Sequence, residues 1–122
     1  MKILFFAPHS ALWIHAFPEA LVAQTLTSAG HEVLYIGCGA EYQRYCIPMN
    51  AQGLTDTSEA SVREAVCRRC KDLRNLIVGE FGFRALDVHD LLDDSDRAAV
   101  DKILSEVDRN SYLALEHYGS RA

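Results

Sequence analysis

Residues 2–36, KILFFAPHSALWIHAFPEALVAQTLTSAGHEVLYI, decide the fold. They begin with the short apolar run KILFFA, which ends at Pro8 and is typical of a strand buried on both faces of a parallel sheet. They end with VLYI, residues 33–36, a second run of the same kind. Because strand, helix and strand fit into about 36 residues, the segment predicts a right-handed βαβ unit.

A helix is expected between these strands, from Ala16 or Pro18 to Ala29. Pro18 suits the first turn of a helix, and Glu19 complements the positive end of the helix dipole there. Gly30 supplies the expected stop signal. The apolar stripe at helical spacing consists of Phe17, Ala20, Leu21, Leu26 and Ala29.

The second half of the chain has a different pattern. Residues 40–58 are rich in turn-forming and small polar residues and are read as irregular. Thr57 or Ser58 is expected to cap a helix over residues 59–75. The stretch NLIVGEFGF, residues 75–83, fits either a short strand or a helix end followed by a turn.

Two more helices are expected towards the C-terminus. One begins at Asp94 or Ser95, and another runs from residue 110 or 111 to Gly119. The acidic run DDSD, residues 93–96, offers oxygen ligands for a divalent ion, but at a helix start such residues serve as the N-cap. We expect the capping role.

These elements predict an α/β fold, with a Rossmann-like βαβ start followed by a mainly helical second half. Residues 1–122 are expected to form one Rossmann-like N-terminal domain with a Cys-rich irregular segment at about 38–70. Because only two strands are clear and a doubly wound sheet needs several more, we expect this domain to be the front portion of a larger protein.

The composition excludes some classes of partner and location. A formal net charge of −5 argues against a nucleic-acid partner, which requires a basic face. The first apolar run is too short for a secretion signal or a membrane span. A cytoplasmic location is therefore expected, in which thiols stay reduced unless a metal holds them.

The loop after the first predicted strand offers candidate catalytic and binding residues. Ligands of open α/β sheets bind beyond the carboxyl ends of the strands, where His9, Ser10, Trp13 and His15 lie. A histidine there suits a general base, and Trp13 suits stacking on a sugar. The alternative is that Trp13 is a core residue and the histidines only contact solvent.

Two glycines follow the second predicted strand in the sequence GCG. Gly37 and Gly39 allow the backbone to approach a ligand or to turn tightly. The stretch lacks the third glycine of a dinucleotide-binding fingerprint and follows the second strand instead of the first. We favour a tight turn that positions Cys38, with both glycines as candidate substrate-binding residues.

The four cysteines of the chain are the second candidate site. Their spacing, C-x7-C-x20-C-x2-C, fits a tetrahedral Zn²⁺ site, and an iron–sulfur cluster requires the same number of thiolates. Ordinary buried thiols and a redox disulfide are the alternatives. The CRRC pair falls late in its predicted helix, which disfavours a redox site of the thioredoxin type. The predicted metal ligands are Cys38, Cys46, Cys67 and Cys70.

The opening segment resembles the start of GT-B-fold glycosyltransferases. The shared features are an MKIL-like first strand, a loop with aromatic and histidine residues, and GHEV, residues 30–33, before the second strand. The cysteine region and the later YLALEHYG, residues 112–119, are similar to bacterial proteins of surface-polysaccharide synthesis. The cysteine cluster departs from most of that family.

The resemblance implies the N-terminal, acceptor-side domain of a glycosyltransferase. It implies a carbohydrate acceptor, a nucleotide-sugar donor bound mainly by a C-terminal domain that this sequence lacks, and proximity to a membrane surface. By position His15, and after it His9, matches the base that deprotonates the acceptor hydroxyl. Such a domain is not expected to be active alone. The alternative function is a stand-alone metal-stabilised binding or scaffold module without catalysis.

Overall fold

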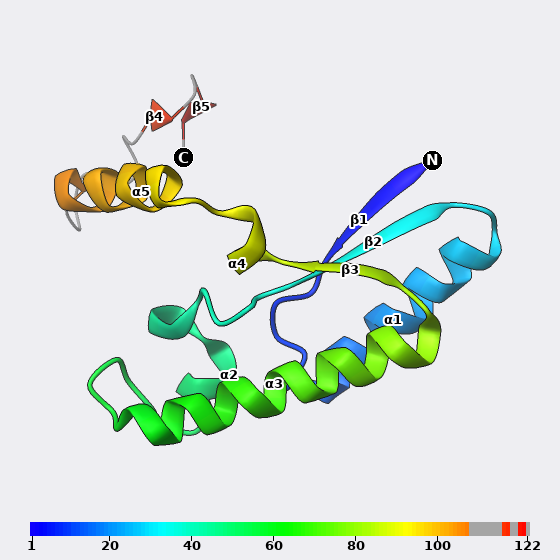
Figure 1. Cartoon of the computed structure of the whole chain (residues 1–122), viewed down its shortest axis with the longest axis horizontal. Coiled ribbons are helices and arrows are strands. Elements are labelled where there is room, and N and C mark those ends of the chain that lie inside the picture. Colours follow the sequence, from blue (N-terminus) through cyan, green and yellow to red (C-terminus); the bar gives the residue numbers. More distant parts are fainter. Residues whose placement is uncertain (108–115, 118–119, 122) are drawn as a thin grey trace. The chain divides into compact units, whose positions relative to one another are not determined.

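The chain forms two compact units, Met1–Leu91 and Leu92–Ala122 (Figure 1). A computed structural model describes residues 1–107, 116–117 and 120–121.

The first unit is built on a parallel sheet with the strand order β1-β2-β3 (Figure 1). Its strands are β1 (Lys2–Phe6), β2 (Glu32–Gly37) and β3 (Arg84–Asp87). Helix α1 (Trp13–Ser28) connects β1 with β2, and α3 (Ala60–Phe81) connects β2 with β3. The predicted βαβ start is confirmed, and β3 adds a second βαβ unit, so the fold is α/β.

Both long helices cover the same face of this sheet and contact each other (Figure 1). Strand order follows chain order, and two right-handed crossovers in one direction put their helices on one face. The core lies between this face and the helices, and the ring of Tyr35 stacks on that of Phe83 at 5.4 Å within it. The buried core residues are Ala7, Ala16, Ala20, Ala23, Val33, Tyr35, Ile77 and Phe83.

The first strand is buried on one face only, so the expectation of burial on both faces is wrong. Leu4 and Phe6 are 60% and 52% exposed, whereas Ile3 and Phe5 alternate with them and are partly buried. The physical reason is the position of the helices, since α1 and α3 both cover the face that Phe5 lies on.

Helix α1 begins at Trp13, about one turn earlier than predicted. Pro18 therefore lies inside the helix and not in its first turn. The face that packs on the sheet is made of small residues, Ala16, Ala20 and Ala23, which let the helix approach β2 closely. Of the predicted apolar stripe, Phe17 and Leu21 are still 38% and 43% exposed.

Helix α3 is longer than predicted and resolves the NLIVGEFGF stretch as a helix end followed by a turn. Glu59 is its N-cap residue, and the expected cap Ser58 instead accepts a hydrogen bond from the backbone N–H of Thr55 at 2.9 Å. Gly82, with φ of +67°, ends the helix in the left-handed conformation, and β3 follows directly.

The segment between β2 and α3 is less irregular than predicted. It contains the 3₁₀ helix η1 (Gln43–Tyr45) and the short helix α2 (Ile47–Asn50), in which Pro48 and Met49 are buried. A further short helix, α4 (Val88–Leu91), follows β3. Helix α2 contacts α3, and α4 contacts β3.

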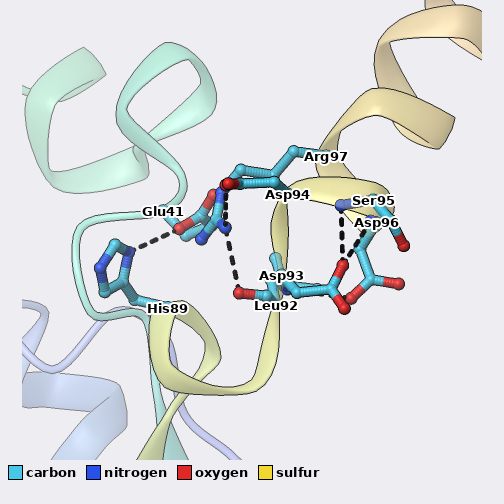
Figure 2. Close-up of polar contacts among 8 residues, drawn as sticks. All are labelled: Glu41, His89, Leu92, Asp93, Asp94, Ser95, Asp96 and Arg97. Atoms are coloured by element: carbon cyan, nitrogen blue, oxygen red, sulfur yellow. Dashed lines mark hydrogen bonds and ion pairs between the residues drawn. The ribbon is translucent and has the colours of Figure 1, made fainter.

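The second unit contains α5 (Asp94–Glu106), which begins with a capping box (Figure 2). The Asp93 carboxylate accepts hydrogen bonds from the N–H groups of Ser95 and Asp96 at 2.8 and 2.9 Å, and the Asp96 carboxylate accepts one from the Asp93 N–H at 3.0 Å. The predicted capping role of the acidic run is confirmed, with the cap one residue earlier than expected.

Two short strands, β4 (Glu116–His117) and β5 (Ser120–Arg121), form an antiparallel pair in the second unit. The helix predicted from residue 110 or 111 to Gly119 falls mostly outside the described residues, and at Glu116–His117 the expectation is wrong. Within the described ranges, no helix has the length and apolar character needed to cross a membrane.

Candidate functional site

A cavity of about 300 Å³ lies at the carboxyl ends of all three parallel strands. The segment after β1 contributes Pro8 and Ser10 to its wall, the segment after β2 contributes Cys38 and Gly39, and β3 contributes its last residue, Asp87. One face of α3 closes the side. Ligands of open α/β sheets bind at this edge, so the location matches the sequence-based expectation.

All four cysteines line this cavity. They come from three separate segments: Cys38 follows β2, Cys46 precedes α2, and Cys67 and Cys70 lie on α3. Each is a partly buried free thiol. CRRC lies in the first half of α3 because the helix extends to Phe81, so its predicted position late in the helix is wrong. The pair is still well inside the helix and away from its N-terminus.

Backbone amides face three of the sulfur atoms. The N–H of Tyr42 donates to Cys38 Sγ at 3.4 Å. The backbone amide of Met49 faces the Cys46 thiol, and those of Ala11 and Ser10 face Cys70, whose Sγ also donates a long hydrogen bond to the carbonyl of Pro8 at 4.0 Å. At Cys46 and Cys70 the amides favour the thiolate form, because an N–H donor stabilises the negative charge on sulfur.

Burial works against the thiolate form in the metal-free protein. It is the main cause that raises the pKa of Cys46, Cys67 and Cys70 above the ordinary value of 9.0, and the charges of neighbouring cysteines raise it further. These thiols are therefore protonated at neutral pH when no metal is bound. A metal that binds them has to displace their protons.

The thiols line the cavity wall without meeting at a single point. Among the residues that the structure describes, no three Cys, His, Asp or Glu side chains come together as ligands of one ion. The donor chemistry thus fits a thiolate-bound metal group, while the positions of the sulfur atoms do not form a ready single-ion site.

Basic side chains share the wall with the thiols. Arg68, Lys71 and Arg74 line the cavity from α3. Arg74 Nη2 lies 3.0 Å from Asp87 Oδ1, and both side chains are mostly buried, at 16% and 17% exposed. This ion pair ties α3 to the end of β3.

The two glycines of GCG allow β3 to approach β2 closely at this edge. A Cβ atom on Gly37 would lie 2.5 Å from Asp87 Oδ1, and one on Gly39 would lie 2.7 Å from His89 Cβ. Gly39 also has a φ of +62°. The predicted tight turn at Cys38 is therefore present, and Gly39 lines the cavity while Gly37 is buried beside the Arg74–Asp87 pair.

The residues predicted in the first loop are divided by the structure. Ser10 is buried, lines the cavity and donates a hydrogen bond to the carbonyl of Ala7 at 3.4 Å. Trp13 is 41% exposed and stacks on Phe17 at 5.3 Å. His15 is exposed on α1, and His9 is partly buried, which lowers its pKa. In the described part of the chain, the cavity wall contains Ser10 but does not contain His9, Trp13 or His15.

Sequence reasoning missed the contribution of β3 and α4 to the cavity. Asp87 and His89 line it, and His89 Nδ1 lies 3.0 Å from Glu41 Oε2 (Figure 2). The sequence did contain a signal for this contribution, because α3 ends at Gly82 and the short run that follows it ends in Asp87. Recognising RALD as a strand would have placed Asp87 at the carboxyl edge.

No family model, curated protein or solved structure matches this chain.

Proposed function

We propose that this chain binds a metal group through Cys38, Cys46, Cys67 and Cys70 and acts as a metal-stabilised binding module of Rossmann-like fold. The observation that supports the proposal most is that all four cysteines of the chain, drawn from three segments, line one cavity. Four thiolates are a ligand set that Zn²⁺ and iron–sulfur clusters both use.

The surroundings of the thiols favour their binding to a metal. Four thiolates around a divalent ion carry a net charge of about −2, and the cavity wall supplies Arg68, Lys71 and Arg74 to offset it. Backbone amides near three of the sulfur atoms direct the positive ends of their N–H dipoles at the sulfur. Such outer contacts fix thiolate ligands in place.

Metal binding would add a further link between the segment of residues 38–59 and α3, which already contact each other through α2. The segment of residues 38–59 contains only short helical pieces, and Cys38 and Cys46 lie within it. Cys67 and Cys70 lie on the long helix α3. A metal held by both pairs fastens the segment to α3, and its binding free energy then adds to the free energy of unfolding.

The test is the thermal stability of the protein purified anaerobically, with and without a chelator. Removal of the metal should lower the melting temperature by about 10 °C or more. Cys67→Ser should lower it similarly, whereas Arg69→Ser, an exposed neighbour on α3 outside the cavity wall, should leave it nearly unchanged. An equal melting temperature for all four samples would remove the proposal.

A second candidate is the acceptor-side domain of a glycosyltransferase, with the nucleotide-sugar bound by another domain. The supporting observation is the position of the cavity at the carboxyl edge of a parallel sheet, with Ser10 and Gly39 in its wall. In this function a carbohydrate acceptor occupies the cavity beside Ser10 and Gly39, and it reaches Trp13 and the base, His15 or His9, only where it extends beyond the cavity wall.

This candidate is tested by titrating the chain with monosaccharides and disaccharides while following its amide signals by NMR. Binding should shift the signals of Ser10 and Gly39, and Trp13→Ala should weaken it. Leu21→Ala, an exposed apolar change further along α1, is the matched control. If no saccharide moves the signals of the cavity wall at millimolar concentration, the chain does not bind a carbohydrate there.

A further inference from the structure

We propose that the first unit pairs with a second copy of this chain through the outer face of α1, with the two α1 helices antiparallel. Among the residues that the structure describes, none on this face lines the cavity, so the proposal does not depend on the metal site. It follows from the exposure of apolar side chains on α1, from their spacing along the helix, and from the polar residues beside them.

Helix α1 presents apolar side chains to solvent as well as to the core. Its inner face, Ala16, Ala20 and Ala23, is buried against the sheet. Apolar residues also occupy the solvent side of the helix, where Ile14 is 78% exposed. We call them the outer stripe: Trp13, Ile14, Phe17, Pro18, Leu21 and Val22. A helix that is apolar on both sides is normally buried on both, and a contiguous exposed apolar patch marks a docking surface.

Aromatic contacts hold the N-terminal part of the outer stripe in place. The ring of Trp13 stacks on that of Phe17, with 5.3 Å between the ring centroids. The ring of Phe17 in turn lies 6.3 Å from that of Phe81, the last residue of α3. Because these rings already contact one another, little side-chain freedom is lost when a partner covers them. Large aromatic side chains held in this way are common anchors of protein interfaces.

The spacing of the outer stripe makes it self-complementary. Its residues form the adjacent pairs 13–14, 17–18 and 21–22, and pairs four residues apart lie along one side of a helix. The pattern reads the same in both directions along the helix. A two-fold interface requires such a pattern, because the same surface serves both copies. When antiparallel helices cross midway between residues 17 and 18, the facing residues are Trp13 with Val22, Ile14 with Leu21, and Phe17 with Pro18.

Polar residues beside the outer stripe favour the antiparallel orientation. His15 and Glu19 are exposed and one turn apart, so they lie on the same flank of the stripe. In the antiparallel pair, position 15 lies opposite position 20 of the other copy, which brings His15 of each copy next to Glu19 of the other. In a parallel pair, His15 would face His15 and Glu19 would face Glu19. The complementary contact of imidazole with carboxylate therefore favours the antiparallel dimer.

The area of the outer stripe is enough for a reversible dimer. Side chains of this kind present about 200 Å² each, and the five largest are on average about half exposed, which leaves on the order of 500 Å² per copy. Two copies would then cover about 1,000 Å², the lower limit for a specific interface. The expected dissociation constant is therefore on the order of micromolar.

A lipid surface fits the outer stripe less well than a second copy does. Helices that lie on anionic membranes carry Lys and Arg along their polar side. Helix α1 contains neither residue type, and the whole chain has a formal net charge of −5. The outer stripe therefore suits an apolar protein surface, which the same stripe of a second copy provides.

The experiment is sedimentation equilibrium of the full chain, purified anaerobically, over about 1–200 µM. We expect the mass to rise with concentration from 13.6 kDa to twice that value. Ile14→Glu places a carboxylate within the apolar contact and should weaken the association about 30-fold or more. Val62→Glu, at a 43% exposed position in the first turn of α3, is the matched control and should change the association by less than about twofold.

Trp13 gives a second measurement that needs no variant and holds even where Ile14→Glu fails to fold. It is the only tryptophan of the chain, so its fluorescence emission reports on the outer stripe alone. On dilution the emission should shift to longer wavelength, as the ring becomes exposed to water. The midpoint of this shift should fall at the concentration at which the mass changes.

The antiparallel orientation is tested by exchanging the two flanking residues. His15→Glu sets carboxylates side by side across the axis and should weaken the dimer about threefold or more. Adding Glu19→His to that variant restores complementary partners and should return the association to within about twofold of the unmutated chain. If the second change weakens the dimer further, the antiparallel pair is rejected.

Other results would overturn the dimer itself. A mass of 13.6 kDa at every concentration would reject it. Binding of such a monomer to vesicles of phosphatidylcholine and phosphatidylglycerol, with a change in Trp13 emission, would assign the outer stripe to a lipid surface instead. A dimer that Ile14→Glu leaves intact, or that forms without a change in Trp13 emission, would place the contact elsewhere on the chain.

Discussion

Gly39 shows how a residue without a side chain shapes the candidate site. It combines a positive φ with a close approach to His89 and Asp87, so a side chain there is both strained and in collision. From the sequence, the GCG stretch indicated a tight turn. The sequence could not show why a glycine is required at this turn, because the atoms that crowd Gly39 belong to the end of β3 and to α4, and β3 begins about 45 residues later in the chain.

Gly39→Ala should lower the free energy of unfolding by about 2 kcal/mol or more. Gly53→Ala is the matched control, since Gly53 has a φ of +70° but nothing within 4 Å of an added Cβ. It should cost only the backbone strain, about 1 kcal/mol. Urea unfolding measures both, and equal losses would show that the contact with His89 is unimportant.

The Arg74–Asp87 pair is the second residue-scale feature of the cavity wall. Asp87→Asn removes the carboxylate that faces a mostly buried guanidinium and should cost about 1–3 kcal/mol of unfolding free energy. Lys2→Ala breaks an exposed pair with Glu32 at 3.9 Å and should change the same quantity by less than about 0.5 kcal/mol. A cost for Asp87→Asn no larger than for Lys2→Ala would contradict the structural role of the pair.

At the level of elements, the sequence predicted the existence and order of β1, α1 and β2, because two apolar runs flank a helical segment that ends at Gly30. It missed β3, since RALD is short and its first residue, Arg84, is exposed. It ended α3 about two turns early, because Gly79 sits inside the helix and resembles a stop signal. Tertiary packing of Ile77 on the sheet keeps the helix going past that glycine.

The start of α5 was predictable because its signal is local. Asp93→Ala removes the acceptor of two first-turn amides and should speed hydrogen exchange at Ser95 and Asp96. Asp94→Ala, at a fully exposed position within the same turn, is the control and should leave those rates nearly unchanged. Similar exchange rates in both variants would mean that the capping box does not hold the helix start in solution.

For the whole first unit, the candidate site is a product of topology. The sequence supplied the four cysteines and the expectation of a metal, but their separation in the chain gives no sign that they share a wall with the end of β3. The parallel sheet brings the ends of its strands to one edge, and α3 presents Cys67 and Cys70 to that edge. His9 and His15 are close to Ser10 in the sequence, but unlike Ser10 they do not line the cavity.

The buried titratable groups make the metal-free protein sensitive to alkaline pH. Burial raises the pKa of Cys46, Cys67 and Cys70, and it raises the pKa of Tyr35 to about 12. Above about pH 9 the unfolded chain loses protons that the folded chain keeps, so the unfolded state is favoured. The free energy of unfolding should be level at about pH 7–8 and fall steadily from about pH 9 upwards. Urea titrations across this range measure it, and a flat profile would contradict the burial of these groups.

The central claim is that the four thiols together hold one metal group. Native mass spectrometry of the protein purified anaerobically tests it most directly. We expect a native mass above that of the polypeptide, with the excess lost on acid denaturation. The four cysteines should react with an alkylating reagent only after that loss. A native mass equal to that of the polypeptide, with all four cysteines already reactive in the folded protein, would contradict it.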